Sequence, residues 1–247
     1  MKNQYFGDVN DYRKYGLLRA LQSKGDLDLL VAWMLTPDDG SRDGGFRSYL
    51  GAAASWSKYD PGLFAGLAGL LRSARQPSVS LIEGSDLLPR ASYYSAVVPD
   101  GRRERDEWRA ALLRASTGVD LVFVDPDNGI EVRSRPVGHT GSSKYVTWGE
   151  IEGLWTAGCS VLIYQHFRRE PRQDFAERLA EELRSRTGGG LVEAFRTPHV
   201  LFLLAAQDRH AQRIRDAIAL LSDRWDGQIN TMGLANKPLQ PTGFAGG

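Results

Sequence analysis

The chain has 247 residues, of which 42% are hydrophobic and 25% charged, proportions that are ordinary for a globular protein. Its 31 Lys and Arg residues almost balance its 30 Asp and Glu residues, so the global charge argues neither for nor against a nucleic-acid partner, and only a local basic patch could indicate one. A single cysteine, Cys159, excludes an internal disulfide and a zinc site built from several cysteines. No segment approaches the ~18 apolar residues of a membrane span, and the N-terminus lacks a signal-peptide core. We therefore expect a cytoplasmic protein without a membrane partner.

The first part of the chain alternates helical and strand-like segments. A helix is predicted to begin after Asp8 or Asn10, either of which can cap it, and to end near Ser23. The segments that follow are predicted to be a buried strand over 29–35, an acidic and glycine-rich loop over 36–45, a mainly helical stretch over 46–75 with a break at 60–62, and a short strand over 79–82.

The remaining elements continue the alternation and define the fold class. They are predicted to be a helix over 102–115, a strand over 119–125, a surface loop over 133–143, a helix from 150 to about 158, a strand over 160–165, a helix over 172–186, strands over 191–196 and 199–206, and a helix over 208–225. The last two strands are joined by a connection too short for a parallel crossover, so they must be antiparallel.

Strands that alternate with helices predict a three-layer α/β fold with a mostly parallel sheet and one antiparallel strand near the C-terminus. We expect this to be a single domain over residues 1–226. Periodicity ends there, and residues 227–247 are expected to form a disordered tail.

The motif with most chemical content is Leu-Val-Phe-Val-Asp-Pro-Asp-Asn-Gly-Ile-Glu over residues 121–131. An apolar strand runs directly into Asp125 and Asp127, and Pro126 between them ends the strand. Ligands of open α/β sheets bind at the carboxyl ends of strands, so we expect the functional site here. The next strand along the chain ends at His166, which is a candidate general base at the same edge of the sheet.

The order of elements, with a reversed strand at the end, resembles the Rossmann-like S-adenosylmethionine-dependent methyltransferases. The Asp-Pro pair at a strand end is similar to the Asp-Pro-Pro-Tyr type motif of the adenine-N6 enzymes, including those that modify ribosomal RNA. The resemblance implies that Asp125, Pro126, Asp127 and Asn128 orient a target amine. This chain departs from the motif because Asp127 replaces its second proline and Asn128 replaces the aromatic that stacks on a flipped base. The helix that carries Asp11, Lys14 and Tyr15 also resembles those enzymes.

The resemblance implies S-adenosylmethionine as cofactor and a nucleic acid or a small amine as acceptor. The loop after the first strand lacks G-x-G-x-x-G and contains three aspartates, which disfavours a dinucleotide. The cofactor residues implied by the resemblance are Thr36 and Gly40 near this loop, and Glu83 or Asp86 at the end of the second predicted strand, where an acid binds the ribose. Candidates for contacts to the acceptor are Lys144, Tyr145 and Arg168.

Two alternatives remain open. Asp125, Asp127 and Glu131 are three carboxylates within seven residues, the ligand type preferred by Mg²⁺ or Mn²⁺ in metal-dependent nucleases and other phosphodiesterases. The second alternative is a non-catalytic binding module that keeps the fold, since fold alone does not specify function. The missing glycine fingerprint and the missing motif aromatic keep this alternative open.

Overall fold

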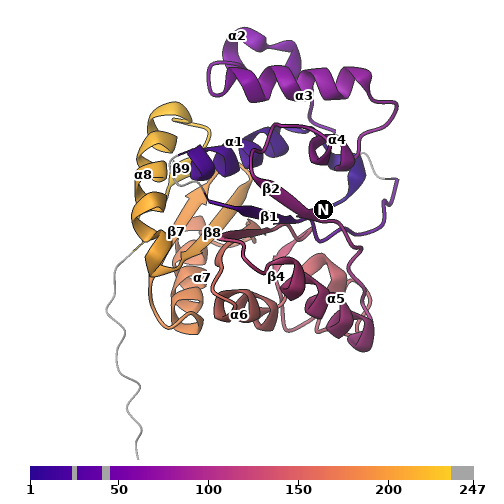
Figure 1. The fold of residues 1–247 in the computed structure, drawn as a ribbon, viewed down its shortest axis with the longest axis vertical. Helices are drawn as coiled ribbons and strands as arrows, with labels where there is room; N and C mark the ends of the chain where they lie inside the picture. Colours follow the sequence, from indigo (N-terminus) through magenta and orange to yellow (C-terminus); the bar gives the residue numbers. More distant parts are fainter. Residues whose placement is uncertain (24–26, 41–44, 235–247) are drawn as a thin grey trace, which may run out of the picture.

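The computed structural model describes residues 1–23, 27–40 and 45–234. Its architecture confirms the predicted three-layer α/β fold, with helices on both faces of a central sheet (Figure 1). Among the described residues this sheet has seven strands in the order β2-β1-β3-β6-β8-β7-β9. Their bounds are β1 Leu29–Ala32, β2 Ala91–Tyr94, β3 Leu121–Val124, β6 Ser160–His166, β7 Leu191–Arg196, β8 Val200–Ala206 and β9 Asn230–Thr231.

The sheet is mostly parallel, and the reversed strand near the C-terminus is present. Strands β2, β1, β3 and β6 pair in parallel, so their carboxyl ends meet at one edge. Strand β8 is antiparallel to both β6 and β7. The antiparallel pairing of β7 with β8 confirms the prediction made from the short connection between these two strands. The two-residue β9 adds a further antiparallel pairing on the outer side of β7.

Helices from different parts of the chain cover the two faces (Figure 1). One face carries α1 Val9–Ser23, α3 Pro61–Ser73 and α8 Asp208–Arg224, and the other carries α5 Arg102–Ala115, α6 Trp148–Thr156 and α7 Arg172–Arg186. The short elements are η1 Asn3–Tyr5, η2 Ser48–Gly51, α2 Ala53–Trp56, α4 Ser80–Glu83, η3 Ser142–Lys144, and the parallel pair of β4 Gly129–Ile130 and β5 Tyr145–Val146.

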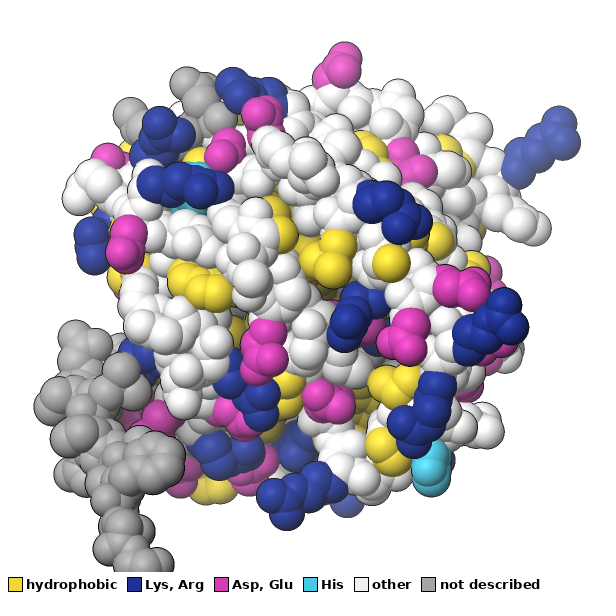
Figure 2. Space-filling view, turned by 60° about the horizontal axis from the view of Figure 1, so that its bottom comes forward, with side chains coloured by type: hydrophobic (Ala, Val, Ile, Leu, Met, Phe, Trp, Pro, Cys, Tyr) yellow, Lys and Arg dark blue, Asp and Glu magenta, His cyan; other side chains and the backbone are white. Residues whose placement is uncertain are grey.

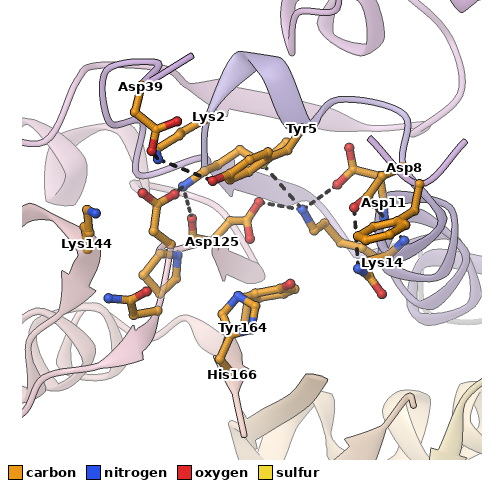
Figure 3. A pocket seen from close by; sticks show the side chains of 16 residues that line it. Lys2, Tyr5, Asp8, Asp11, Lys14, Asp39, Asp125, Lys144, Tyr164 and His166 are labelled. Carbon is orange, nitrogen blue, oxygen red and sulfur yellow. Dashed lines mark hydrogen bonds and ion pairs between the residues drawn. The ribbon is translucent and has the colours of Figure 1, made fainter. Parts of the chain in front are cut away.

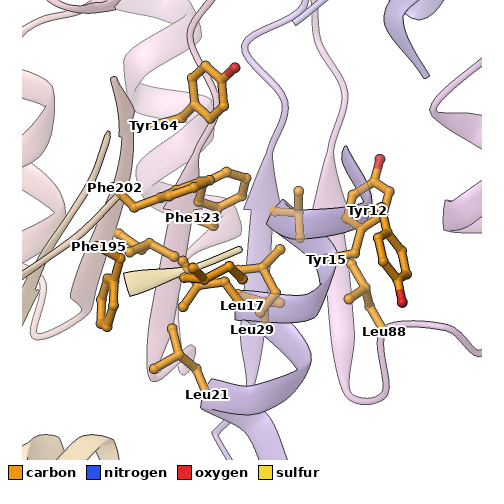
Figure 4. Packing of buried hydrophobic residues seen from close by; sticks show 14 of the residues in the cluster. Tyr12, Tyr15, Leu17, Leu21, Leu29, Leu88, Phe123, Tyr164, Phe195 and Phe202 are labelled. Carbon is orange, nitrogen blue, oxygen red and sulfur yellow. The ribbon is translucent and has the colours of Figure 1, made fainter. Parts of the chain in front are cut away.

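The central strands are buried on both faces, as their continuous apolar runs predict. Leu121 and Phe123 enter the core beneath α1, α3 and α8, while Val122 and Val124 enter the core beneath α5, α6 and α7. This alternation follows from the two-residue period of a strand. Figure 4 shows the first core, in which Phe123 and Phe202 pack near Leu17 of α1.

Helix α1 is fixed at its N-terminus by a cap and along its length by a close contact. Asp8 Oδ1 accepts hydrogen bonds from the backbone N–H groups of Asn10 and Asp11, each at 2.8 Å, so the predicted cap is confirmed. A Cβ atom on Gly16 would lie 2.0 Å from the ring of Trp225, and only glycine lets the end of α8 approach so closely. The cap and this contact set where the first turns of α1 lie.

The strand predicted over 79–82 is wrong, because Ser80–Glu83 form the one-turn helix α4. Val79 and Ile82 are three residues apart and both buried, which places them on the same side of a helical turn. A short apolar segment of this length does not distinguish such a turn from a strand. Asn3 Oδ1 accepts the N–H of Val79 at 3.0 Å and so fixes the start of this turn. The strand that pairs with β1 is instead β2, Ala91–Tyr94.

Two predicted boundaries differ in the structure. Strand β1 ends at Ala32, and beyond it Leu35 forms an isolated bridge with Val97. Of the segment expected to be a tail, Ile229 and Met232 are buried, and the described part adds β9 to the sheet. Residues 235–247 lie outside the described residues. Within the described ranges, no helix is long and apolar enough to cross a membrane.

Candidate functional site

A cavity of about 470 Å³ opens at the carboxyl ends of β3 and β6 (Figure 3). Its wall includes the N-terminal segment, the first turns of α1, the turn after β3 and the end of β6, together with Asp39, Phe46 and Lys144 from three other segments. We call it the acidic cavity after the aspartates in its wall, which are Asp8, Asp11, Asp39, Asp125 and Asp127. Its position is the one that the strand ends predicted.

The turn after β3 contributes four consecutive wall residues, Asp125, Pro126, Asp127 and Asn128. Gly129 follows at a φ of +121°, and a Cβ atom there would lie 2.3 Å from the Gln165 amide, so this position requires glycine. The Asn128 carbonyl accepts the backbone N–H of His166 at 3.2 Å, and the Asn128 N–H donates to the Lys144 carbonyl at 2.9 Å. His166 and Lys144 also line the cavity, so these six predicted residues are brought together.

Lys14 is the central charge of the site, and its side chain is only 3% exposed. Its Nζ donates to Asp11 Oδ1 at 2.8 Å and to Asp125 Oδ2 at 2.7 Å (Figure 3). Burial acts to lower the pKa of Lys14, but the two carboxylates outweigh it, and the pKa lies above its ordinary value. Burial raises the pKa of Asp125, and Lys14 offsets this only in part. The first helix and the end of β3 are therefore joined by a buried ionic network.

Asp127 is held by different partners on the other side of the cavity. Its Oδ1 lies 2.7 Å from the α-amino group of Met1, and its Oδ2 accepts the hydroxyl of Thr36 at 2.6 Å. Burial acts to raise the pKa of Asp127, but the amino group and the Thr36 hydrogen bond outweigh it, so the pKa is lowered. Asp127 is consequently an anion at neutral pH.

The pKa values of two titratable wall residues, Asp8 and His166, are shifted in opposite directions by burial. Burial, together with the charge of Asp11, raises the pKa of Asp8 to about 7. The side chain of His166 is exposed to the cavity, but the surrounding protein atoms lower its pKa by desolvation. The negative charge of Asp127 offsets part of this decrease. His166 is therefore a neutral base at neutral pH, whereas Asp8 changes its charge in that range.

The four residues predicted to hold the cofactor do not line the acidic cavity. Thr36 supports Asp127, and Gly40 is exposed. Glu83 accepts the indole N–H of Trp33 at 2.8 Å and the hydroxyl of Ser95, while Asp86 is exposed. The loop after β1 instead contributes Asp39, which forms an ion pair with Lys2 in the cavity wall.

The remaining predicted residues lie away from this cavity. Tyr145 belongs to β5, and its carbonyl accepts a hydrogen bond from Arg105 at 2.7 Å. Arg168 and Glu131 line a separate cavity of about 730 Å³, where Glu131 accepts the backbone N–H of Trp148 at 2.7 Å. Glu131 therefore does not join the two aspartates. Over residues 1–23, 27–40 and 45–234, no group of three or more His, Cys, Asp or Glu side chains is arranged to hold a metal ion.

The cavity wall also contains residues for which the sequence predicted no role there, namely Lys2, Tyr5, Asp8, Asp39 and Tyr164. A signal for one of them was present, because Asp8, Asp11 and Lys14 recur every three residues, which places the cap residue and two residues of α1 on one side of the helix. Charged residues on the buried side of a helix need partners, which points to a site. Asp39 and Tyr164 gave no such signal, since their placement depends on contacts between distant parts of the chain.

Neither the protein-family models nor the curated proteins with which the chain was compared gave a match.

Proposed function

We propose that this protein is an S-adenosylmethionine-dependent methyltransferase that transfers a methyl group to an amine of its acceptor in the acidic cavity. The observation that carries the proposal is the Asp125–Asn128 turn, which leaves β3 at its carboxyl end and forms one wall of a cavity of ligand size. The strand order supports it, because the methyltransferase class also ends its sheet with a strand, a helix and a reversed strand.

The side chains of the cavity fit the charges of this cofactor. S-adenosylmethionine carries a sulfonium, an ammonium and a carboxylate. The wall contains five aspartates that attract the cations and the amines of Lys2, Lys14 and Lys144 that attract the carboxylate, although Lys2 and Lys14 are already paired with wall aspartates. A volume of about 470 Å³ lies within the usual range of ligand pockets. When bound, the cofactor supplies an electrophilic methyl group, and a polyphosphate ligand is disfavoured by the aspartates.

Acceptor groups for the target amine are available on the turn. Within the described residues, no donor contacts the Pro126 carbonyl or the side-chain amide of Asn128. These oxygens accept the N–H groups of the amine and aim its lone pair into the cavity. Neutral His166, on the same wall, takes the proton that the amine loses. Lys14 acts as a positioning residue, because it fixes the Asp125 carboxylate.

A nucleic acid acceptor needs local rather than global electrostatic attraction. The face that carries α5, α6 and α7 presents basic and acidic side chains interspersed with one another (Figure 2). This distribution matches the formal net charge of +1 and disfavours broad electrostatic binding across that face. On that face, recognition of a nucleic acid would therefore depend on local contacts rather than on a broad positive surface.

The proposal is tested by a methyl-transfer assay with radiolabelled S-adenosylmethionine. The acceptors are total RNA, DNA and a panel of small amines. The full chain should label one of these acceptor classes, and Asp125→Asn should reduce the rate by about 100-fold or more through loss of orientation. The matched control is Asp216→Asn, which alters an exposed residue of α8. Absence of labelling in every class by folded protein would contradict the proposal.

A further inference from the structure

A second cavity, of about 610 Å³, adjoins the acidic cavity and shares Asn10 and Phe46 with it. We call it the aromatic cavity, because Phe46, Tyr49 and Trp56 line it together with Arg13 and His199. Tyr49 and Trp56 are packed edge to face, with ring centroids 5.6 Å apart. A ligand that spans the shared wall would touch both aromatic rings and the acidic site.

Phe46 has the exposure expected of a ligand-binding aromatic. Its side chain is 67% exposed, and among the described residues Val97 is the only other large hydrophobic side chain with comparable exposure. Every other large aromatic of the described chain is packed or half-buried. An unpacked ring at the junction of two cavities offers a flat surface for stacking.

Arg13 is an independent indication of an anionic ligand. It is 5% exposed and lies over the Trp56 ring, 5.3 Å from its centroid. Three of its N–H groups donate to Gln228 and Asn10, and no carboxylate lies within ion-pair distance among the described residues. Buried charges are usually paired, and a guanidinium has more donors than these bonds use. Within the described part of the chain Arg13 forms no ion pair, although the charge of Asp8 acts on it from a longer distance, so its unused donors remain available to a phosphate.

We propose that the aromatic cavity binds one nucleotide of the acceptor, with its base stacked on Phe46 and its phosphate held by Arg13. The inference rests on the proposed function, since the amine of the stacked base reaches the acidic cavity through the wall that Asn10 and Phe46 share. It also assigns a source for the stacking ring that the Asp125–Asn128 turn lacks. The acceptor class is then a nucleobase that is unpaired or flipped out of its stack.

Calorimetric titration of the full chain with the four common ribonucleoside 5′-monophosphates tests the inference, with ribose 5-phosphate as the probe that lacks a base. At least one monophosphate should bind more tightly than ribose 5-phosphate. Phe46→Leu should weaken that binding by about fivefold or more, while Phe46→Tyr should retain it, because stacking needs the ring. Val97→Ala is the matched control, since it shortens an exposed hydrophobic residue outside both cavities and should leave binding unchanged.

The contribution of Arg13 is measured by the preference for a monophosphate over its nucleoside, which Arg13→Gln should abolish. If that buried substitution unfolds the chain, as circular dichroism would show, the Phe46 variants still decide the question. Equal binding of the monophosphates by Phe46→Leu and the original chain, or no binding of any monophosphate, would overturn the inference.

A parallel titration with S-adenosylhomocysteine separates the two proposals. If a monophosphate binds in a manner that depends on Phe46 and S-adenosylhomocysteine does not bind, the nucleotide site is supported and the methyltransferase proposal is rejected. The reverse result rejects the nucleotide site and leaves the methyltransferase standing.

Discussion

Lys14 Nζ and Asp125 Oδ2 lie 2.7 Å apart although 111 residues separate them in the chain. Both side chains are at most 3% exposed, and Asp11 is a second carboxylate on the same ammonium group. Removing such charges from water is costly, and only good geometry with additional partners offsets the cost. The pair therefore indicates a preformed site, in which α1 is fixed against the end of β3 before any ligand arrives.

Replacing Lys14 by Met should lower the free energy of unfolding by about 3–5 kcal/mol, because two buried carboxylates lose their cation. Adding Asp125→Asn should recover part of this loss, since one unpaired charge is then removed as well. Urea denaturation of the two single variants and the double variant measures the coupling. Strictly additive effects would contradict the network.

The raised pKa of Asp8 predicts a specific pH dependence of stability. The folded-state pKa is about 7, above the ordinary aspartate value of 3.8, so the folded protein binds the proton more tightly. The contribution of this group to stability should therefore fall as the pH rises from 3.8 to about 7, by at most about 1.4 kcal/mol per pH unit, and then level off. Asp8→Asn should flatten the curve of unfolding free energy against pH, whereas Asp223→Asn at an exposed position should not.

Two helical glycines should respond to alanine in opposite directions. Gly16→Ala places a methyl group 2.0 Å from the Trp225 ring and should cost about 1–3 kcal/mol through overpacking between α1 and α8. Gly69→Ala, inside α3, meets nothing within 4 Å and should stabilise by up to about 1 kcal/mol through helix propensity. Midpoints of thermal unfolding report both changes. Equal shifts for the two variants would contradict the close contact of Gly16.

Gly129→Ala should destabilise the chain more than Gly118→Ala. Both residues have positive φ, +121° and +78°, so alanine strains the backbone at each by about 1–2 kcal/mol. Only Gly129 adds a clash, with the Gln165 amide, while Gly118 faces open space. Denaturant midpoints give the difference, and equal losses would mean that the turn after β3 relaxes freely. A matching drop in ligand binding for Gly129→Ala alone would place this turn in the site.

The elements that the sequence predicted best are those with a strong period. Helices α5 and α7 begin and end at the predicted residues, because their apolar positions recur at helical spacing. Strands β3, β6 and β8 were visible as continuous apolar runs. Strand β2 was missed, since none of its four residues is buried and the segment Ala-Ser-Tyr-Tyr has no apolar run. The one-turn helix α4 was mistaken for a strand because two buried residues do not define a period.

The site could be predicted where a motif coincides with a strand end. The turn from Asp125 to Asn128 and the end of β6 at His166 were placed correctly at one edge of the sheet. Of the residues predicted for the cofactor, Glu83 and Asp86 lie outside the cavity because they were assigned to the end of a strand that is a helix, whereas Thr36 and Gly40 follow a true strand but do not line the cavity. The contact of Lys2 with Asp39 joins segments that only the folded chain brings together.

A calorimetric titration of the full chain with S-adenosylhomocysteine tests the central claim most directly, because it needs no knowledge of the acceptor. We predict saturable binding of one molecule per chain, with a shift of several degrees in thermal unfolding at about 100 times the dissociation constant. Lys14→Met should weaken this binding, since the cavity loses its central cation. No heat and no thermal shift at millimolar ligand, with the chain folded, would contradict the methyltransferase proposal.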